Sequence, residues 1–169
     1  HVAGQSLASA LVACIPDGRL RVEALPATEL SGFGLRADMR DTLVVAISQS
    51  GTTTDTNRTV DLVRDRGASV LAIVNRRGSD LTDKADGVMY TSDGRDVEMS
   101  VASTKAFYAQ VAAGVLLACA IAAAAGRGAS RRRHELLASL RDLPTAMSEV
   151  LTRREHIGEA ARRYAPHKR

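Results

Sequence analysis

The feature that most constrains the fold is a continuous apolar segment, residues 42–47, which is rich in β-branched side chains. A run of this kind without polar alternation is typical of a strand covered on both faces, as in a parallel sheet. It leads directly into a hydroxyl-rich loop and then into a helical pattern over 53–66, where Gly67 occupies the expected C-terminal cap. This succession predicts the first half of a strand–helix–strand unit.

The rest of the chain continues the alternation of strands and helices. Short apolar runs at 70–74 and 87–90 predict two more buried strands, and a β-like segment is expected at 20–24. Helices are expected at 3–15, near 27–30, at 103–125, at 131–151 and at 154–164. Pro144 is expected to kink or split the helix over 131–151. The order predicts an α/β fold with a doubly wound, mainly parallel sheet flanked by helices.

Composition agrees with one soluble domain. The chain has 169 residues, of which 45% are hydrophobic and 25% charged, so disordered and collagen-like classes are excluded. Two cysteines, Cys14 and Cys119, are too few for a disulfide scaffold and are interpreted as buried packing residues. They lie at no metal-ligand spacing from the histidines, so a zinc site is not expected. No other metal and no organic cofactor is expected either, because the loop that follows residues 42–47 offers hydroxyl and backbone groups and no carboxylates.

Charge and hydropathy argue against nucleic-acid and membrane partners. Residues 126–169 carry 11 basic and 5 acidic side chains, but they contain one aromatic residue and no nucleic-acid-binding motif. The longest apolar run, 111–125, falls short of the ~20 residues that a membrane span needs, and is interpreted as a buried helix. With no signal peptide visible, a cytoplasmic location is expected.

The loop after the first strong strand is the first candidate site. It reads Ser48-Gln49-Ser50-Gly51-Thr52-Thr53-Thr54. In α/β sheets, ligands bind beyond the carboxyl ends of strands, where helix N-termini supply free N–H groups and a positive dipole end. Gly51 lets the backbone approach an anion, and the lack of Lys excludes a Walker loop. The loop predicts a metal-free phosphate site, although one of its hydroxyls would suffice as an ordinary N-cap.

The second candidate site lies where residues 100–105 enter the long apolar helix. Ser103 and Thr104 would approach the same sheet edge as the first loop. Lys105 opposes the helix dipole there, which favours an anion or an acidic neighbour as its partner. A capping motif with a solvated lysine explains these residues equally well.

These motifs carry a family resemblance that runs over essentially the whole chain. Residues 45–53 and 101–107 together resemble the isomerase half of glutamine:fructose-6-phosphate amidotransferase, which is a pair of sugar isomerase (SIS) domains. Further matches in order and spacing are 72–75, 78–81 and 85–88. The resemblance implies an SIS-type sheet whose first strand is missing here. It also implies that 1–152 form the first SIS domain, with a helix over 153–169 leading toward a second one.

The resemblance also implies which residues bind the ligand. The phosphate of a hexose 6-phosphate is held by Ser48, Gln49, Ser50 and Thr53. The sugar end faces Val101, through its backbone, and Ser103. Gly51 and Lys105 are further candidates, and Thr52 stands where the synthases usually carry Glu.

No catalytic residue is assigned in this chain. The resemblance implies that a carboxylate base, lysines and a histidine lie in the second SIS domain, so the chain is expected to bind the phosphosugar without turning it over. Glu98, the one acidic residue near the second loop, is interpreted as solvated, and His134 and His156 as surface residues.

Several functions stay open at this point. The leading expectation is a domain of an enzyme that makes glucosamine 6-phosphate from fructose 6-phosphate and glutamine-derived ammonia. A regulatory phosphosugar sensor, or a deglycase or deaminase on the same fold, is the alternative. The apolar helix over 106–125 also predicts self-association or pairing with a second SIS domain.

Overall fold

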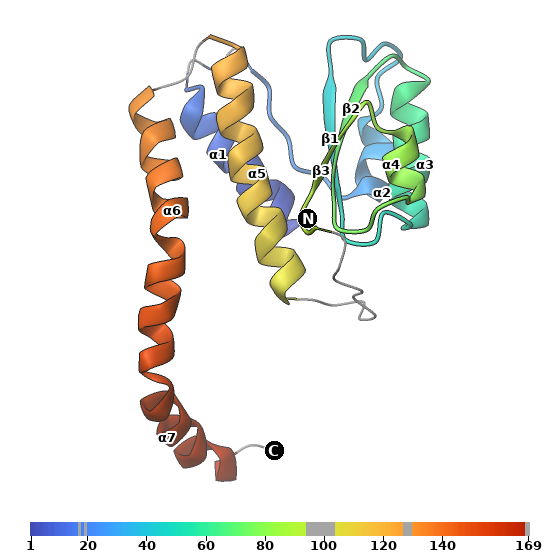
Figure 1. Ribbon diagram of the computed structural model, residues 1–169. Coiled ribbons are helices and arrows are strands. Elements are labelled where there is room, and N and C mark those ends of the chain that lie inside the picture. Colours follow the sequence, from blue (N-terminus) through green and yellow to red (C-terminus); the bar gives the residue numbers. More distant parts are fainter. Residues whose placement is uncertain (17, 19, 94–103, 127–129, 168–169) are drawn as a thin grey trace. The chain divides into compact units, whose positions relative to one another are not determined.

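The computed structural model describes residues 1–16, 18, 20–93, 104–126 and 130–167 (Figure 1). Its internal contacts divide the chain into two units, residues 1–130 and residues 131–169. The predicted domain boundary at residue 152 lies inside the second unit and stays a prediction.

A parallel sheet of three strands forms the centre of the first unit. The strands β1 (Leu43–Ser48), β2 (Ser69–Val74) and β3 (Gly87–Tyr90) lie in the order β1-β2-β3. Ser48 is in register with Val74, and Val74 with Tyr90, so all three strands end at one edge. The three strongly predicted strands are confirmed, with Ser48 at the end of the first strand instead of in the loop.

One face of the sheet is covered by α2 (Ala27–Glu29), α3 (Thr54–Arg64) and α4 (Asp80–Lys84), as Figure 1 shows. A π-helical turn, Leu30–Gly34, follows α2. Val60 and Val63 of α3 and Leu81 of α4 are fully buried with Val70 of β2. Burial of such aliphatic side chains stabilises the fold by about 1.5–3 kcal/mol each.

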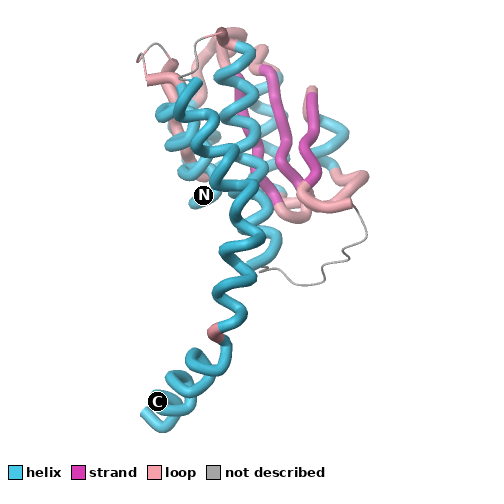
Figure 2. The backbone as a smooth tube through the Cα atoms, turned by 60° about the vertical axis from the view of Figure 1, so that its left-hand side comes forward, coloured by secondary structure: helices cyan, strands magenta, loops and turns pink. Residues whose placement is uncertain are grey.

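The other face is covered by α1 (Val2–Cys14) and α5 (Thr104–Ala124), so the strands lie between two helix layers (Figure 2). Leu7 of α1 and Leu117 of α5 pack with Ile73 of β2. Gly114 permits close approach of the two helices, because a Cβ there would lie 3.2 Å from Leu7 Cβ. Helices on both faces of a parallel sheet confirm the predicted α/β fold class.

Helix α5 is long and apolar enough to cross a membrane by length and composition alone. Its packing favours a core helix, since Gln110, Ala113, Leu117 and Ala122 are buried. The core helix of a soluble protein passes the same length and composition test.

The second unit is helical. It contains most of α6 (Ser130–Thr152), α7 (Arg154–Tyr164) and a terminal 3₁₀ turn, Ala165–His167. Large apolar side chains are exposed along these helices, namely Leu143, Met147, Val150, Leu151, Ile157 and Tyr164.

Two local predictions are wrong. Residues 20–24 form no strand; the segment is largely exposed, and Arg21 pairs with Glu23 within it. Pro144 does not split α6, which continues to Thr152, whereas the kink that was the other expectation stays a prediction. The missing proline N–H leaves the Leu140 carbonyl without its helical donor, a loss that water can offset on a helix as exposed as this one.

Candidate functional site

The candidate site is the turn that joins β1 to α3. Ser48 ends β1 and is buried, and its Oγ accepts a hydrogen bond from the Gly51 N–H at 3.1 Å. Gly51 is buried with φ of 68°, a left-handed conformation that favours glycine. A Cβ at Gly51 would lie 2.7 Å from the Ser79 Cβ and still closer to its Oγ. The turn therefore requires glycine for its backbone conformation and for the space that it leaves.

Hydroxyl groups are concentrated at the outer part of this turn. Ser50 Oγ accepts hydrogen bonds from the Thr52 N–H at 3.3 Å and from Thr52 Oγ1 at 3.0 Å. Ser50 is half-buried, whereas Thr52 and Thr53 are exposed. The Ser50 hydroxyl keeps its own proton available as a donor in this arrangement.

The N-terminus of α3 faces the turn without a side-chain cap. Thr53 is the N-cap residue, and its side chain makes no hydrogen bond with the first helical turn. The first N–H groups of a helix lack intrahelical partners and carry the positive end of the dipole. An uncapped N-terminus next to several hydroxyls can bind an anion.

A second loop, between β2 and α4, lies against the first. The N–H groups of Asn75 and Arg76 donate to the Gln49 carbonyl at 3.2 and 3.3 Å, and the Leu81 N–H donates to the Gly51 carbonyl at 3.1 Å. This loop also brings two arginines to the carboxyl edge of the sheet. One of them, Arg77, stacks over the Tyr90 ring at 4.2 Å. The edge is therefore polar near the turn, with charged side chains of both signs: the two arginines, and Asp55 and Asp80 in the first turns of α3 and α4.

The predicted site residues fall into three groups. The structure brings together Ser48, Gln49, Ser50, Gly51 and Thr53 in one turn. Val101, Ser103 and Glu98 lie outside the described residues, and their assigned or excluded roles stay predictions. Thr104 and Lys105 form the exposed start of α5.

Two residues in this region are absent from the predicted set. Asn57 of α3 is buried and donates from Nδ2 to the carbonyls of Gly51 and Thr53 at 3.0 and 3.1 Å. Ser79 is buried against Gly51 and forms a capping box with Thr82. The Ser-x-x-Thr spacing signals the cap. An Asn inside a helix, where its propensity is low, is the only local signal for Asn57.

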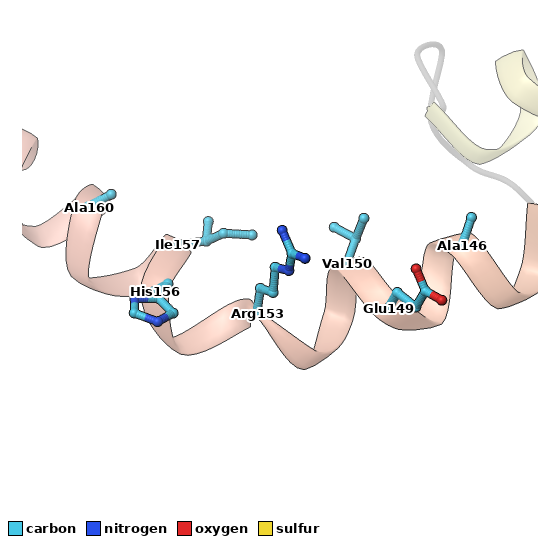
Figure 3. Close-up of a pocket in the computed structure, with 7 residues that line it drawn as sticks. All are labelled: Ala146, Glu149, Val150, Arg153, His156, Ile157 and Ala160. Carbon is cyan, nitrogen blue, oxygen red and sulfur yellow. The ribbon is translucent and has the colours of Figure 1, made fainter.

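A hollow away from the turn lies in the second unit. It has a volume of about 490 Å³ and is formed by α6 and α7 around Val150, Arg153 and Ile157, whose side chains point to the same side in Figure 3. His156 and Glu149 also line it, but the hollow is an open bend of exposed helices. His134 and His156 are exposed, as predicted. Within the described residues, no cluster of three or more His, Cys, Asp or Glu could hold a metal ion.

Comparison with curated proteins gives close relatives that share one name. The chain is 44% identical over 121 residues to "Glutamine--fructose-6-phosphate aminotransferase [isomerizing]" of Corynebacterium efficiens, which covers 72% of this chain and 19% of the relative. It is 43% identical over 130 residues to the protein of the same name from Mycobacterium tuberculosis, covering 75% of this chain and 20% of the relative. The chain thus spans about a fifth of the length of these relatives.

Solved structures share the fold. The C-terminal domain of glucosamine-fructose-6-phosphate aminotransferase from Francisella tularensis superposes with a TM-score of 0.79 at 23% identity, covering 96% of this chain and 44% of that one. Glucosamine-6-phosphate deaminase from Thermotoga maritima superposes with a TM-score of 0.57 at 20% identity, covering 79% of this chain and 39% of that one. The family described as "SIS domain" matches residues 26–120, which include all three strands and the β1–α3 turn. The chain therefore belongs to the SIS domain family.

Proposed function

We propose that the β1–α3 turn binds the phosphate of a hexose 6-phosphate. The observation that carries the proposal is the uncapped N-terminus of α3 beside the hydroxyls of Ser48 and Ser50. Backbone N–H and hydroxyl groups are the donors that hold a phosphate without a metal. In this proposal Ser50, Thr53 and Gln49 bind the phosphate, and Ser48 shapes the turn and can donate its own proton. Val101 and Ser103 contact the sugar.

We propose further that this domain serves an aminotransferase that converts fructose 6-phosphate and glutamine-derived ammonia into glucosamine 6-phosphate. The names of the relatives at 43–44% identity support this activity. Aldose–ketose isomerisation needs a base positioned near C1 and C2 of the sugar. No residue of this chain is assigned that role, so we expect the 169-residue chain to bind the sugar phosphate without isomerising it.

Thermal unfolding in the presence of ligand tests the binding proposal. The melting temperature is measured with fructose 6-phosphate, glucose 6-phosphate and inorganic phosphate at millimolar concentrations. A ligand that binds only the folded state adds RT ln(1 + [L]/Kd) to the free energy of unfolding. A hundredfold excess over Kd adds about 2.7 kcal/mol, which is a shift of several degrees.

Ser50→Ala is the test variant and Ser148→Ala is its matched control. Ser148 is an exposed serine of α6 that donates to the Pro144 carbonyl, far along the chain from the turn. We expect the stabilisation by sugar phosphates to disappear in Ser50→Ala and to persist in Ser148→Ala. Equal stabilisation of both variants would contradict the assignment of the phosphate to this turn.

We also propose that the chain associates through its exposed apolar helix surfaces and acts in the cytoplasm. Met147, Val150 and Ile157 are 56–59% exposed, which is unusual for large apolar side chains on the surface of a monomer. A second copy of this chain, or a second SIS domain, would cover them. The cytoplasmic location is supported by the two cysteines, which are both buried and form no disulfide.

A further inference from the structure

Asn57, in the first turns of α3, has a buried side-chain amide that contacts the candidate phosphate turn from the protein interior. It is 6% exposed. Its Nδ2 donates to the carbonyls of Gly51 at 3.0 Å and Thr53 at 3.1 Å, which fixes the nitrogen on the side of the turn. Its backbone N–H donates to the Thr53 carbonyl as well, at 3.0 Å.

These two bonds orient the backbone of the turn. A trans peptide unit is planar, so its C=O and the following N–H point in opposite directions. When Asn57 holds the Gly51 and Thr53 carbonyls on the protein side, the N–H groups of Thr52 and Thr54 are directed away from Asn57. Without a ligand, the Thr52 N–H makes a long hydrogen bond of 3.3 Å to Ser50 Oγ, which a bound phosphate would replace or share. Thr52 and Thr54 are both exposed, on the side where the phosphate is proposed to bind.

The other acceptors of the turn are held in the same way. The Gln49 carbonyl accepts the N–H groups of Asn75 and Arg76, and the Gly51 carbonyl also accepts that of Leu81. Those bonds come from the backbone and do not depend on side-chain identity. Asn57 is thus the one described side chain that donates to carbonyls of residues 49–53.

The oxygen of the Asn57 side chain destabilises the folded state. Asn57 Oδ1 is buried without a hydrogen-bond partner among the described residues. An unpaired buried carbonyl destabilises the folded state, and an apolar side chain of the same size would avoid the loss. The residue is therefore better explained by what its Nδ2 does for the turn than by the stability of α3.

We propose that Asn57 is a positioning residue that aims the N–H groups of Thr52 and Thr54 at the bound phosphate. The inference rests on the proposed phosphate site. It assigns to Asn57 no contact with the ligand itself.

Three variants separate positioning from simple stabilisation. Asn57→Leu removes the amide at similar volume. Asn57→Ser restores one bond, because a serine hydroxyl in a helix can donate to the carbonyl four residues earlier, here that of Thr53. Thr59→Val is the matched control, since Thr59 is a buried α3 side chain that bonds the carbonyls of Ala27 and Asp55 and not the turn.

Binding of inorganic phosphate and fructose 6-phosphate is measured by amide NMR titration well below each melting temperature. We expect the Kd to rise about tenfold or more in Asn57→Leu, the loss for one misaligned bond to a charged group. The Kd of Asn57→Ser should lie between that of Asn57→Leu and that of the original chain. Thr59→Val should lower the melting temperature and leave the Kd unchanged. An unchanged Kd in both Asn57 variants would overturn the proposal, as would an equal rise in Thr59→Val.

Measurements on the unliganded protein distinguish a failure of the phosphate-binding proposal from a failure of the Asn57 proposal. If the original chain binds neither ligand, the proposed function fails. The amide resonances of Thr52 and Thr54 in the unliganded Asn57→Leu variant still decide the positioning role. We expect them to shift, while those of α4 stay in place, and unshifted Thr52 and Thr54 resonances would overturn the inference.

Discussion

At the scale of single residues, Gly51 shows how little freedom the β1–α3 turn has. Two separate restrictions meet there: a φ of 68° and the contact with Ser79. Gly78 has a similar φ of 61°, but a Cβ there would meet nothing within 4 Å. The pair of glycines therefore separates the cost of backbone conformation from the cost of the clash.

We predict that Gly78→Ala lowers the free energy of unfolding by about 1–2 kcal/mol, the usual penalty for a left-handed residue with a Cβ. Gly51→Ala should cost more, by a further ~1–3 kcal/mol, because Ser79 must also move. Urea denaturation of both variants measures the difference. Equal losses would mean that the Ser79 side chain yields without cost, and that the turn is less restricted than its geometry implies.

At the scale of elements, Asp86 joins the start of β2 to the end of α3. Its Oδ2 accepts the Val70 N–H at 2.7 Å, and its Oδ1 accepts Arg64 Nη1 at 2.7 Å. The bond from the Val70 N–H, followed by that from Arg64, lowers the pKa of Asp86 below its ordinary value. Because the folded-state pKa is lowered, the stabilisation is present above the unfolded-state pKa, about 3.9, and is lost as the pH falls.

We therefore predict that Asp86→Asn lowers the melting temperature at pH 7 and flattens its decline between about pH 5 and pH 2. Asp65→Asn, which changes an exposed aspartate at the end of α3, is the matched control and should keep the original decline. Circular dichroism melts across this pH range provide the measurement. A decline in Asp86→Asn as steep as in the original chain would show that Asp86 does not contribute to acid sensitivity.

The elements that could be predicted from the sequence are those whose burial is visible in their apolar composition. Residues 42–47, 70–74 and 87–90 are apolar almost throughout because both faces of these strands are covered. The segment 20–24 carries a similar local pattern, but a strand also needs a neighbour, which no local pattern specifies. The sequence predicts an interruption at Pro144 in a helix that continues, since one lost hydrogen bond on an exposed helix does not end it.

The candidate site could be predicted only in part, for a related reason. Ser48, Ser50, Gly51 and Thr53 are close together in the sequence, so the turn is visible as a motif. Asn57 becomes important only because the fold places its amide below two carbonyls of the turn. That placement depends on the angle at which α3 leaves the sheet, and no spacing rule gives it.

At the scale of the whole molecule, the two units differ in how they bury apolar surface. Two clusters of buried apolar side chains among the described residues, one around Val60 and Leu81 and the other around Leu7 and Ile73, belong to residues 1–130. The residues of α7 are all exposed or half-exposed, and α7 has no buried residue. The first unit therefore contains what it needs to fold.

We predict that a chain ending at residue 130 folds with a single cooperative thermal transition and keeps dispersed amide NMR signals. The physical reason is that its core loses no buried side chain. The full chain serves as the control in the same measurement. Loss of dispersion in the shorter chain would contradict the prediction and would make α6 necessary for folding of the first unit.

The exposed apolar side chains of the second unit give a separate prediction. Val150→Glu should reduce self-association, because it places a charge among Leu143, Met147 and Leu151. Thr145→Glu is its control, since residue 145 lies about 200° around the helix from residue 143 and carries the same charge away from these side chains. Light scattering over a range of protein concentrations measures the mass. A chain that is monomeric at high concentration in all forms would refute self-association.

The bonds between the two loops also determine where the chain can change in length. Donors at Asn75 and Leu81 reach fixed acceptors at Gln49 and Gly51, so the segment between Asn75 and Leu81 must keep its number of residues. An insertion there would misalign the turn through the Leu81 N–H, even though the inserted residue never touches it. The segment 20–26 is not fixed at both ends by such hydrogen bonds to the turn and lies largely exposed, so it can accept insertions. Length variation in relatives with an intact turn should therefore be tolerated before β1 and excluded between β2 and α4.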